Sequence, residues 1–241
     1  MIAGGAGVPE TLVRIREELA AHSDARFRSV MATFSREPIE ALGVRSPEVK
    51  RIAAGVYKAV KQWPAAGRDR LCLELWKSGV MEEGAIAIYV YRRFRKQSGA
   101  REFRLFESWI DRYVRNWGHC DGVSSWLLSG CIENVPALIA RLDKWTGARN
   151  RWKRRAAAVS LLQEAKRGRN LDAILRISAA LLKDPDDLVQ KGVGWLLKEA
   201  YPRRPREIVR FLAARKVEAT RLLLRYAAEK MSAADRLRVL G

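Results

Sequence analysis

The feature that most constrains the fold is a helical pattern that repeats along almost the whole chain. Apolar residues recur every three or four positions, and almost no segment shows the alternation typical of a strand. Prolines lie between the periodic segments, where helices begin or end. These prolines are Pro9, Pro47, Pro64, Pro136, Pro185 and Pro205. The pattern predicts an all-α protein built from short, closely spaced helices.

The second helix of each predicted pair resembles the next one along the chain, with a small residue near its start and an aliphatic run behind it. By difference of residue numbers, successive starts are 32, 38, 34, 36 and 30 residues apart. An irregular, wholly helical period of this size is typical of HEAT-like repeats. We therefore expect an all-α HEAT-like helical repeat solenoid of about six antiparallel helix pairs, with a basic concave face, forming one domain over 1–241. An ordinary helical bundle is the alternative. The predicted starts are Arg51, Glu83, Asp121, Arg155, Lys191 and Arg221.

Two segments carry strong helix-start signals. Ser46-Pro47-Glu48 combines a hydroxyl for capping, a proline in the first turn and an acid near the helix N-terminus. Asp184-Pro185-Asp186-Asp187 has the same character.

The charge balance predicts a polyanionic partner. The 241 residues include 46 Lys and Arg and 27 Asp and Glu, which gives a formal net charge of +19. The hydrophobic fraction of 48% argues against disorder. Uncharged apolar stretches such as 85–91 are far shorter than the ~18–20 residues of a membrane span. Three cysteines favour a reducing compartment over a disulfide framework. We expect no signal peptide, and a cytoplasmic protein.

In segment 187–200, a helical projection turns Trp195 away from the apolar stripe, to the side that also carries Lys191 and Lys198. A large aromatic flanked by lysines on a non-core face indicates a docking surface, although packing against a neighbouring repeat is an equally good explanation. The stripe itself consists of Val189, Val193, Leu196, Leu197 and Ala200.

Segment 119–132 repeats this arrangement. Asp121 lies well off its apolar stripe, and Trp117 lies one helical turn earlier on the same face. An isolated acid in so basic a chain could cap a helix, pair with an Arg, or act as a carboxylate kept ionised by nearby Arg. The stripe consists of Cys120, Val123, Leu127 and Cys131.

In the next repeat, Arg155 lies on the flank of the stripe, beside Trp152. Asp121, Arg155 and Lys191 therefore occupy equivalent positions in three successive repeats, and a solenoid would present them along one concave surface. The stripe consists of Ala158, Leu161, Leu162 and Ala165.

Three motifs together resemble, in order and spacing, the AlkD-type DNA alkylation repair glycosylase family, that is, the HEAT-like repeat alkylpurine DNA glycosylases. The similarity runs from Gly43-Val44-Arg45-Ser46-Pro47-Glu48 to Tyr226-Ala227-Ala228-Glu229-Lys230. Each motif is weak alone, and the combination is fairly specific. The motifs are Asn116-Trp117-Gly118-His119-Cys120-Asp121, Trp152-Lys153-Arg154-Arg155 and Gln190-Lys191-Gly192-Val193-Gly194-Trp195.

The resemblance implies a helical-repeat fold that grips duplex DNA and a monofunctional glycosylase that removes N3- and N7-alkylated purines without flipping the base into a pocket. It also implies that Trp117 and Trp195 face the sugar and backbone of the lesion, that Asp121 is the catalytic carboxylate, and that Arg155 supports DNA binding. One departure is Phe34, where the family has a tyrosine, so stacking is retained without a hydroxyl.

The implied partner is duplex DNA containing alkylated purines. We expect a monomer in the bacterial cytoplasm with access to the nucleoid, no membrane contact, no cofactor and no metal, because two histidines and three scattered cysteines give no zinc spacing. About half of the candidate DNA-binding residues are expected to be plain helix surface. The candidates are Arg45, Lys50, Trp152, Lys153, Arg154, Arg155, Lys191 and Lys198.

Other chemistries fit less well. His119, Cys120 and Asp121 are adjacent on a helix and point about 100° apart, which excludes a linear catalytic triad. There is no glycine-rich phosphate loop for ATP or NAD. Two alternatives stay open: a non-catalytic DNA-binding protein on the same scaffold, and a protein-interaction solenoid that would need neither the basic face nor Asp121 between tryptophans.

Overall fold

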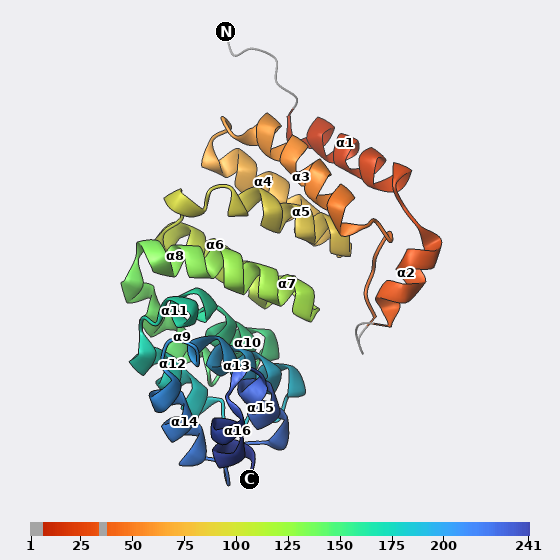
Figure 1. The fold of residues 1–241 in the computed structure, drawn as a ribbon. Helices are drawn as coiled ribbons and strands as arrows, with labels where there is room; N and C mark the ends of the chain where they lie inside the picture. The colour runs from red at the N-terminus through yellow and green to blue at the C-terminus, as the bar shows by residue number, and fades with distance from the viewer. Residues whose placement is uncertain (1–6, 34–37) are drawn as a thin grey trace. The chain divides into compact units, whose positions relative to one another are not determined.

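A computed structural model describes residues 7–33 and 38–241, and within these ranges every regular element is helical (Figure 1). The all-α prediction is therefore confirmed. The chain divides into two compact units, the first formed by 1–96 and 112–122 and the second by 97–111 and 123–241. The single domain expected over 1–241 stays a prediction.

The first unit is built on α3 and α5, which pack against each other; α1 packs on α3 and α4, and α7 packs on α5. Its interior is apolar, with Leu71, Leu75, Ile86 and Val90 fully buried. A further element, η1 (Arg95–Gln97), is a short 3₁₀ turn at the end of the unit's first segment, with its last residue assigned to the second unit. The helices are α1 (Val8–Ala21), α2 (Ala25–Ala32), α3 (Ser46–Val60), α4 (Ala65–Lys77), α5 (Met81–Arg92) and α7 (Trp117–Gly122).

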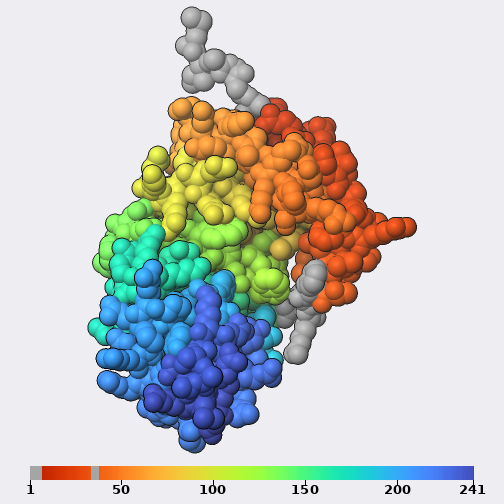
Figure 2. Space-filling view, viewed as in Figure 1, coloured from red at the N-terminus to blue at the C-terminus, as the bar shows by residue number. Residues whose placement is uncertain are grey.

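The second unit is built on α10, α13 and α15, which pack in that order. Side chains close the spaces that the ribbon leaves between the C-terminal helices, drawn in blue in Figure 2. Its elements are α6 (Ala100–Arg112, whose last residue is assigned to the first unit), the π-helix η2 (Val123–Leu128), α8 (Ser129–Asn134), η3 (Pro136–Leu138), α9 (Ile139–Trp145), α10 (Arg151–Val159), α11 (Leu162–Arg167), α12 (Leu171–Ala180), α13 (Asp187–Ala200), α14 (Pro205–Ala213), α15 (Arg221–Ala227), η4 (Ala228–Lys230) and α16 (Ala233–Leu240).

The repeat is more regular than the sequence indicates. The helices α3, α5, α7, α10, α13 and α15 begin 35, 36, 34, 36 and 34 residues apart. The predicted starts lie up to five residues too far toward the C-terminus. The reason is that the repeats were matched on their first small residues and not on the residues that cap the helices. The prediction of a helical repeat is confirmed, and its register is corrected.

The helix-start signals are confirmed in position and corrected in one mechanism. Helix α3 begins at Ser46, but its N-cap is Arg45 and no side chain caps it. Helix α13 begins after Asp186, whose carboxylate accepts hydrogen bonds from the backbone N–H groups of Leu188 and Val189, at 2.8 and 3.3 Å. The six prolines all lie at or just before the first turn of a helix.

A buried carboxylate holds the chain that leads into α3. Glu82, 2% exposed at the start of α5, accepts hydrogen bonds from the backbone N–H groups of Leu42, Gly43 and Val44, at 3.0, 2.9 and 3.0 Å. Gly43 has φ +81°, and a Cβ there would lie 2.2 Å from the Asp24 carbonyl oxygen. The close approach and the left-handed backbone both require glycine.

The predicted apolar stripes are confirmed. All thirteen of their residues are buried.

The three cysteines are free and buried, and burial raises the pKa of the Cys131 thiol to about 12. Within the described ranges no helix is both long and apolar enough for a bilayer, and no three His, Cys, Asp or Glu side chains are grouped as a metal site would need.

Candidate nucleic-acid interface

In the first unit, Trp117 and Asp121 lie one helical turn apart on α7. The helix starts where it does because Asn116 precedes it, and the Asn116 Oδ1 accepts the His119 backbone N–H at 2.8 Å. Trp117 is 42% exposed, which is a large fraction for an indole side chain. Asp121 is half-buried. The pair predicted from the sequence therefore lies together, with an exposed indole one helical turn from a half-buried carboxylate.

His119 anchors α7 to the start of α5. Its Nε2–H donates to the Met81 carbonyl oxygen at 2.8 Å, and its Nδ1 accepts from the Asn116 side-chain amide at 3.3 Å. The Trp76 ring packs edge-on against the imidazole, with 4.8 Å between ring centroids. Burial lowers the pKa of His119 to about 4, the Met81 hydrogen bond opposing it, so the imidazole is neutral at neutral pH.

The imidazole occupies a slot that exists because residue 84 is glycine. A Cβ at Gly84 would lie 2.6 and 2.7 Å from the Cε1 and Nε2 atoms of His119. Gly84→Ala should therefore displace His119, cost about 1–3 kcal/mol of stability by overpacking, and slow any reaction that depends on Trp117 and Asp121. The melting temperature and the single-turnover rate of base release measure the two effects.

Gly55→Ala on α3 is the matched control, because a Cβ at Gly55 meets nothing within 4 Å. That substitution should raise stability by up to about 1 kcal/mol, through helix propensity alone. Equal melting temperatures for the two variants would show that His119 does not need the slot.

In the second unit, Arg155 is buried on α10, with 6% of its surface exposed. It donates to the Leu188 carbonyl oxygen in the first turn of α13. A Cβ at Gly192 would lie 3.3 Å from its Cγ atom, so Gly192 gives the side chain room to reach α13. Arg155 thus has a structural contact that the sequence did not predict, at the helix that carries Trp195.

Trp195 is half-buried on α13, off the apolar stripe as predicted. Its neighbour Gly194 allows α13 to approach α15 closely, because a Cβ there would lie 2.5 Å from the Cβ of Tyr226 and 2.9 Å from the Leu223 carbonyl oxygen. The two glycines of this motif therefore allow α13 to pack closely on α10 and on α15.

Gln190 belongs to the third motif, and the sequence alone indicates no role for it. It is 2% exposed, and its amide donates to the carbonyl oxygens of Leu182 and Asp184 at 3.0 and 2.8 Å. Its Oε1 accepts from the Thr220 hydroxyl at 2.9 Å, and Thr220 caps α15. A polar residue within an otherwise apolar helical face is the signal that could have marked it.

Several predicted phosphate-binding cations are engaged by carboxylates of the same unit. Lys153 pairs with Glu107 at 3.0 Å and Asp111 at 2.9 Å, and Arg154 pairs with Asp184 at 2.6 Å. These ion pairs link α10 to α6 and to the segment before α13, and the DNA contacts of both residues stay predictions.

Three further residues predicted to bind DNA differ in their exposure and in their ion pairs. Lys198 pairs with Glu229 at 2.6 Å. Arg45 is exposed, 3.5 Å from Asp24 and stacked 4.8 Å above the Phe27 ring. Lys191 is half-buried and forms no ion pair among the described residues. Arg45 and Lys191 are therefore more available to an anion than Lys198.

The two other aromatic residues predicted to contact DNA are Trp152 and Phe34. Trp152 is 6% exposed and lies under the Arg151 guanidinium, 4.4 Å from its ring centroid. The predicted DNA contact of Trp152 stays a prediction. Phe34 lies outside the described residues.

The sequence profile of the DNA alkylation repair enzymes matches residues 15–231. The chain belongs to this family. A solved structure described as a predicted DNA alkylation repair enzyme from Enterococcus faecalis is similar, with 15% identity, a TM-score of 0.79, and 88% of this chain and 98% of that chain covered. AlkD2 from Streptococcus mutans is similar with 17% identity, a TM-score of 0.61, and 91% and 100% coverage. No curated protein shows significant sequence similarity.

Family membership establishes a role in DNA alkylation repair, with DNA as the substrate. The two solved structures establish the helical-repeat fold and, at these identities, nothing further. Trp117 and Asp121 belong to the first unit, and Arg155, Lys191 and Trp195 to the second. Their predicted alignment along one concave surface stays a prediction.

Proposed function

We propose that this family member is a monofunctional DNA glycosylase that hydrolyses the N-glycosidic bond of cationic N3- and N7-alkylated purines in duplex DNA, without flipping the base into a pocket. The observation that carries the proposal is the pairing of an exposed indole, Trp117, with the carboxylate of Asp121 on a helix that His119 anchors.

The chemistry needs few groups. An N3- or N7-alkylated purine already carries a positive charge, so its glycosidic bond is weak and no acid has to protonate the leaving base. The remaining task is to stabilise the sugar as it becomes oxocarbenium-like and to deliver water to it. Asp121 would supply the electrostatic stabilisation, often the largest single contribution to a rate, and would orient the water as a general base.

The tryptophans would favour the same charge. An indole face attracts a cation by about 0.5–2 kcal/mol, depending on how far both are desolvated. Trp117 is 42% exposed, and we assign this contact to its indole. We assign the same role to Trp195 in the second unit, and we assign DNA backbone contacts to Arg45 and Lys191, with Arg155 supporting binding through α13.

The test is incubation of the purified protein with a duplex that contains one 7-methylguanine. The expected result is free 7-methylguanine and an abasic site in equal amounts. Duplex binding without base release would favour the non-catalytic DNA-binding alternative, and absence of duplex binding would favour the protein-interaction alternative.

A further inference from the structure

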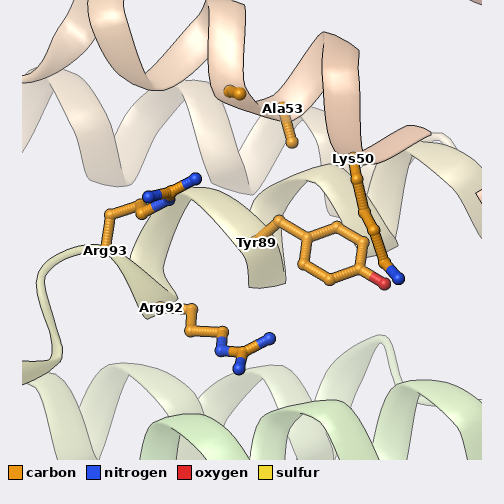
Figure 3. A pocket seen from close by; sticks show the side chains of 6 residues that line it. Lys50, Ala53, Tyr89, Arg92 and Arg93 are labelled. Carbon is orange, nitrogen blue, oxygen red and sulfur yellow. The ribbon is translucent and has the colours of Figure 1, made fainter. Parts of the chain in front are cut away.

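The first unit contains a pocket of about 440 Å³ between α3 and the C-terminal end of α5 (Figure 3). It does not include Trp117 or Asp121. The small side chains on α3 leave the space that the longer side chains of α5 surround. The lining residues are Lys50, Ala53, Ala54, Tyr89, Arg92 and Arg93.

The charge of this pocket is of one sign. Three of the six lining side chains are cationic and none is acidic. Within the described part of the chain, neither Lys50 nor Arg93 forms an ion pair with a carboxylate, in contrast to Lys153 and Arg154. A concave site lined by side chains of one charge sign concentrates anions.

The donors are arranged around the hollow. In Figure 3, Lys50 extends along the Tyr89 ring, so that its amino group lies beside the phenol oxygen, while Arg92 and Arg93 approach from the end of α5. The Arg93 guanidinium also lies 5.8 Å from the centroid of the Tyr57 ring, a contact that limits its freedom.

Tyr89 adds a neutral donor. Burial raises the pKa of its phenol, and the nearby Arg92 charge opposes this shift only in part. The hydroxyl therefore stays protonated at neutral pH and can donate a hydrogen bond to an oxyanion. Ammonium, guanidinium and phenol groups together match the several acceptor oxygens of a phosphate.

We propose that this pocket binds a backbone phosphate of the DNA duplex, at a point separate from the α7 pair. The inference rests on the proposed function only in taking DNA as the partner. Because a phosphate contact positions the protein without reading sequence, the pocket should contribute to binding of damaged and undamaged duplex alike.

The test uses the full chain with an undamaged fluorescent duplex, whose affinity is measured at several salt concentrations. The Lys50→Ala/Arg93→Ala double variant should lower the slope of log affinity against log salt by about 0.9, because the pocket neutralises one phosphate and each neutralised phosphate contributes about 0.9. Affinity should then fall about 3.5-fold less between about 50 and 200 mM salt. Both side chains are exposed, so the variant should keep its melting temperature.

Two further variants separate pocket binding from overall charge. Lys144→Ala/Lys216→Ala removes the same charge from exposed positions outside the pocket and should leave the slope unchanged. Tyr89→Phe should weaken binding a few-fold at every salt concentration, with the slope retained. An equal slope for the pocket variant and the unaltered protein would overturn the proposal.

Inorganic pyrophosphate distinguishes a small free anion from a DNA backbone. Micromolar pyrophosphate binding that the double variant abolishes, with an unchanged duplex slope, would make this a small-anion site and overturn the proposal. If the unaltered protein releases no 7-methylguanine but the double variant lowers the slope as expected, the glycosylase proposal fails and the phosphate pocket stands.

Discussion

Asp121→Asn should release 7-methylguanine from duplex DNA about 10²–10³-fold more slowly than the unaltered protein, the effect of removing one preorganised electrostatic group. The amide has the size of the carboxylate and can still accept a hydrogen bond, but it carries no charge to stabilise an oxocarbenium-like sugar. Binding of undamaged duplex should stay equal or tighten slightly, because a negative charge is lost near a polyanion.

Single-turnover release with enzyme in excess measures the chemical step, and fluorescence anisotropy measures binding. Asp172→Asn is the matched control, since it removes the same charge from an exposed position in the first turn of α12 and should change neither value. Parallel loss of base release and DNA affinity in Asp121→Asn would show that Asp121 is architectural.

Glu82→Ala should lower the free energy of unfolding by at least about 3 kcal/mol. The substitution leaves the backbone N–H groups of Leu42, Gly43 and Val44 without their acceptor, and each buried donor left unpaired costs about 1–3 kcal/mol. For a chain of this size, 1 kcal/mol corresponds to about 2–4 °C, so the melting temperature should fall by about 6–12 °C.

Glu82→Gln separates hydrogen bonding from charge. Glu82 Oε1 accepts from both Gly43 and Val44, and an amide oxygen in its place would keep those two bonds and lose the one from Leu42. An intermediate melting temperature is expected. If the Glu82→Ala variant had the same melting temperature as the unaltered protein, water or another group would have to replace the carboxylate as the hydrogen-bond acceptor.

Helix faces could be predicted from the sequence because they depend on local periodicity. Turning Trp195 and Asp121 away from their apolar stripes required only the 3.6-residue repeat, and the buried stripes confirm that projection. The same logic gave the exposed Trp117, one turn from Asp121.

The function of individual cations could not be predicted, because their partners are distant in sequence. Arg154 pairs with Asp184, thirty positions away, and Lys198 pairs with Glu229. The residues around Trp152 do not distinguish it from the exposed Trp117, yet tertiary packing buries Trp152. A single sequence does not contain these pairings.

His119 illustrates the same limit. Its position beside Cys120 and Asp121 argued against a triad, but its anchoring contact to Met81 depends on a glycine 35 positions earlier, which the local sequence does not indicate. The slot at Gly84 is a property of how α7 packs on α5.

The central claim is that Asp121 and the tryptophans act on a base that is already positively charged. It is tested most directly by comparing release of 7-methylguanine with release of neutral 1,N6-ethenoadenine, each placed once in the same duplex sequence. We expect rapid release of the cationic base and little or none of the neutral one. Release of both at similar rates would contradict the claim.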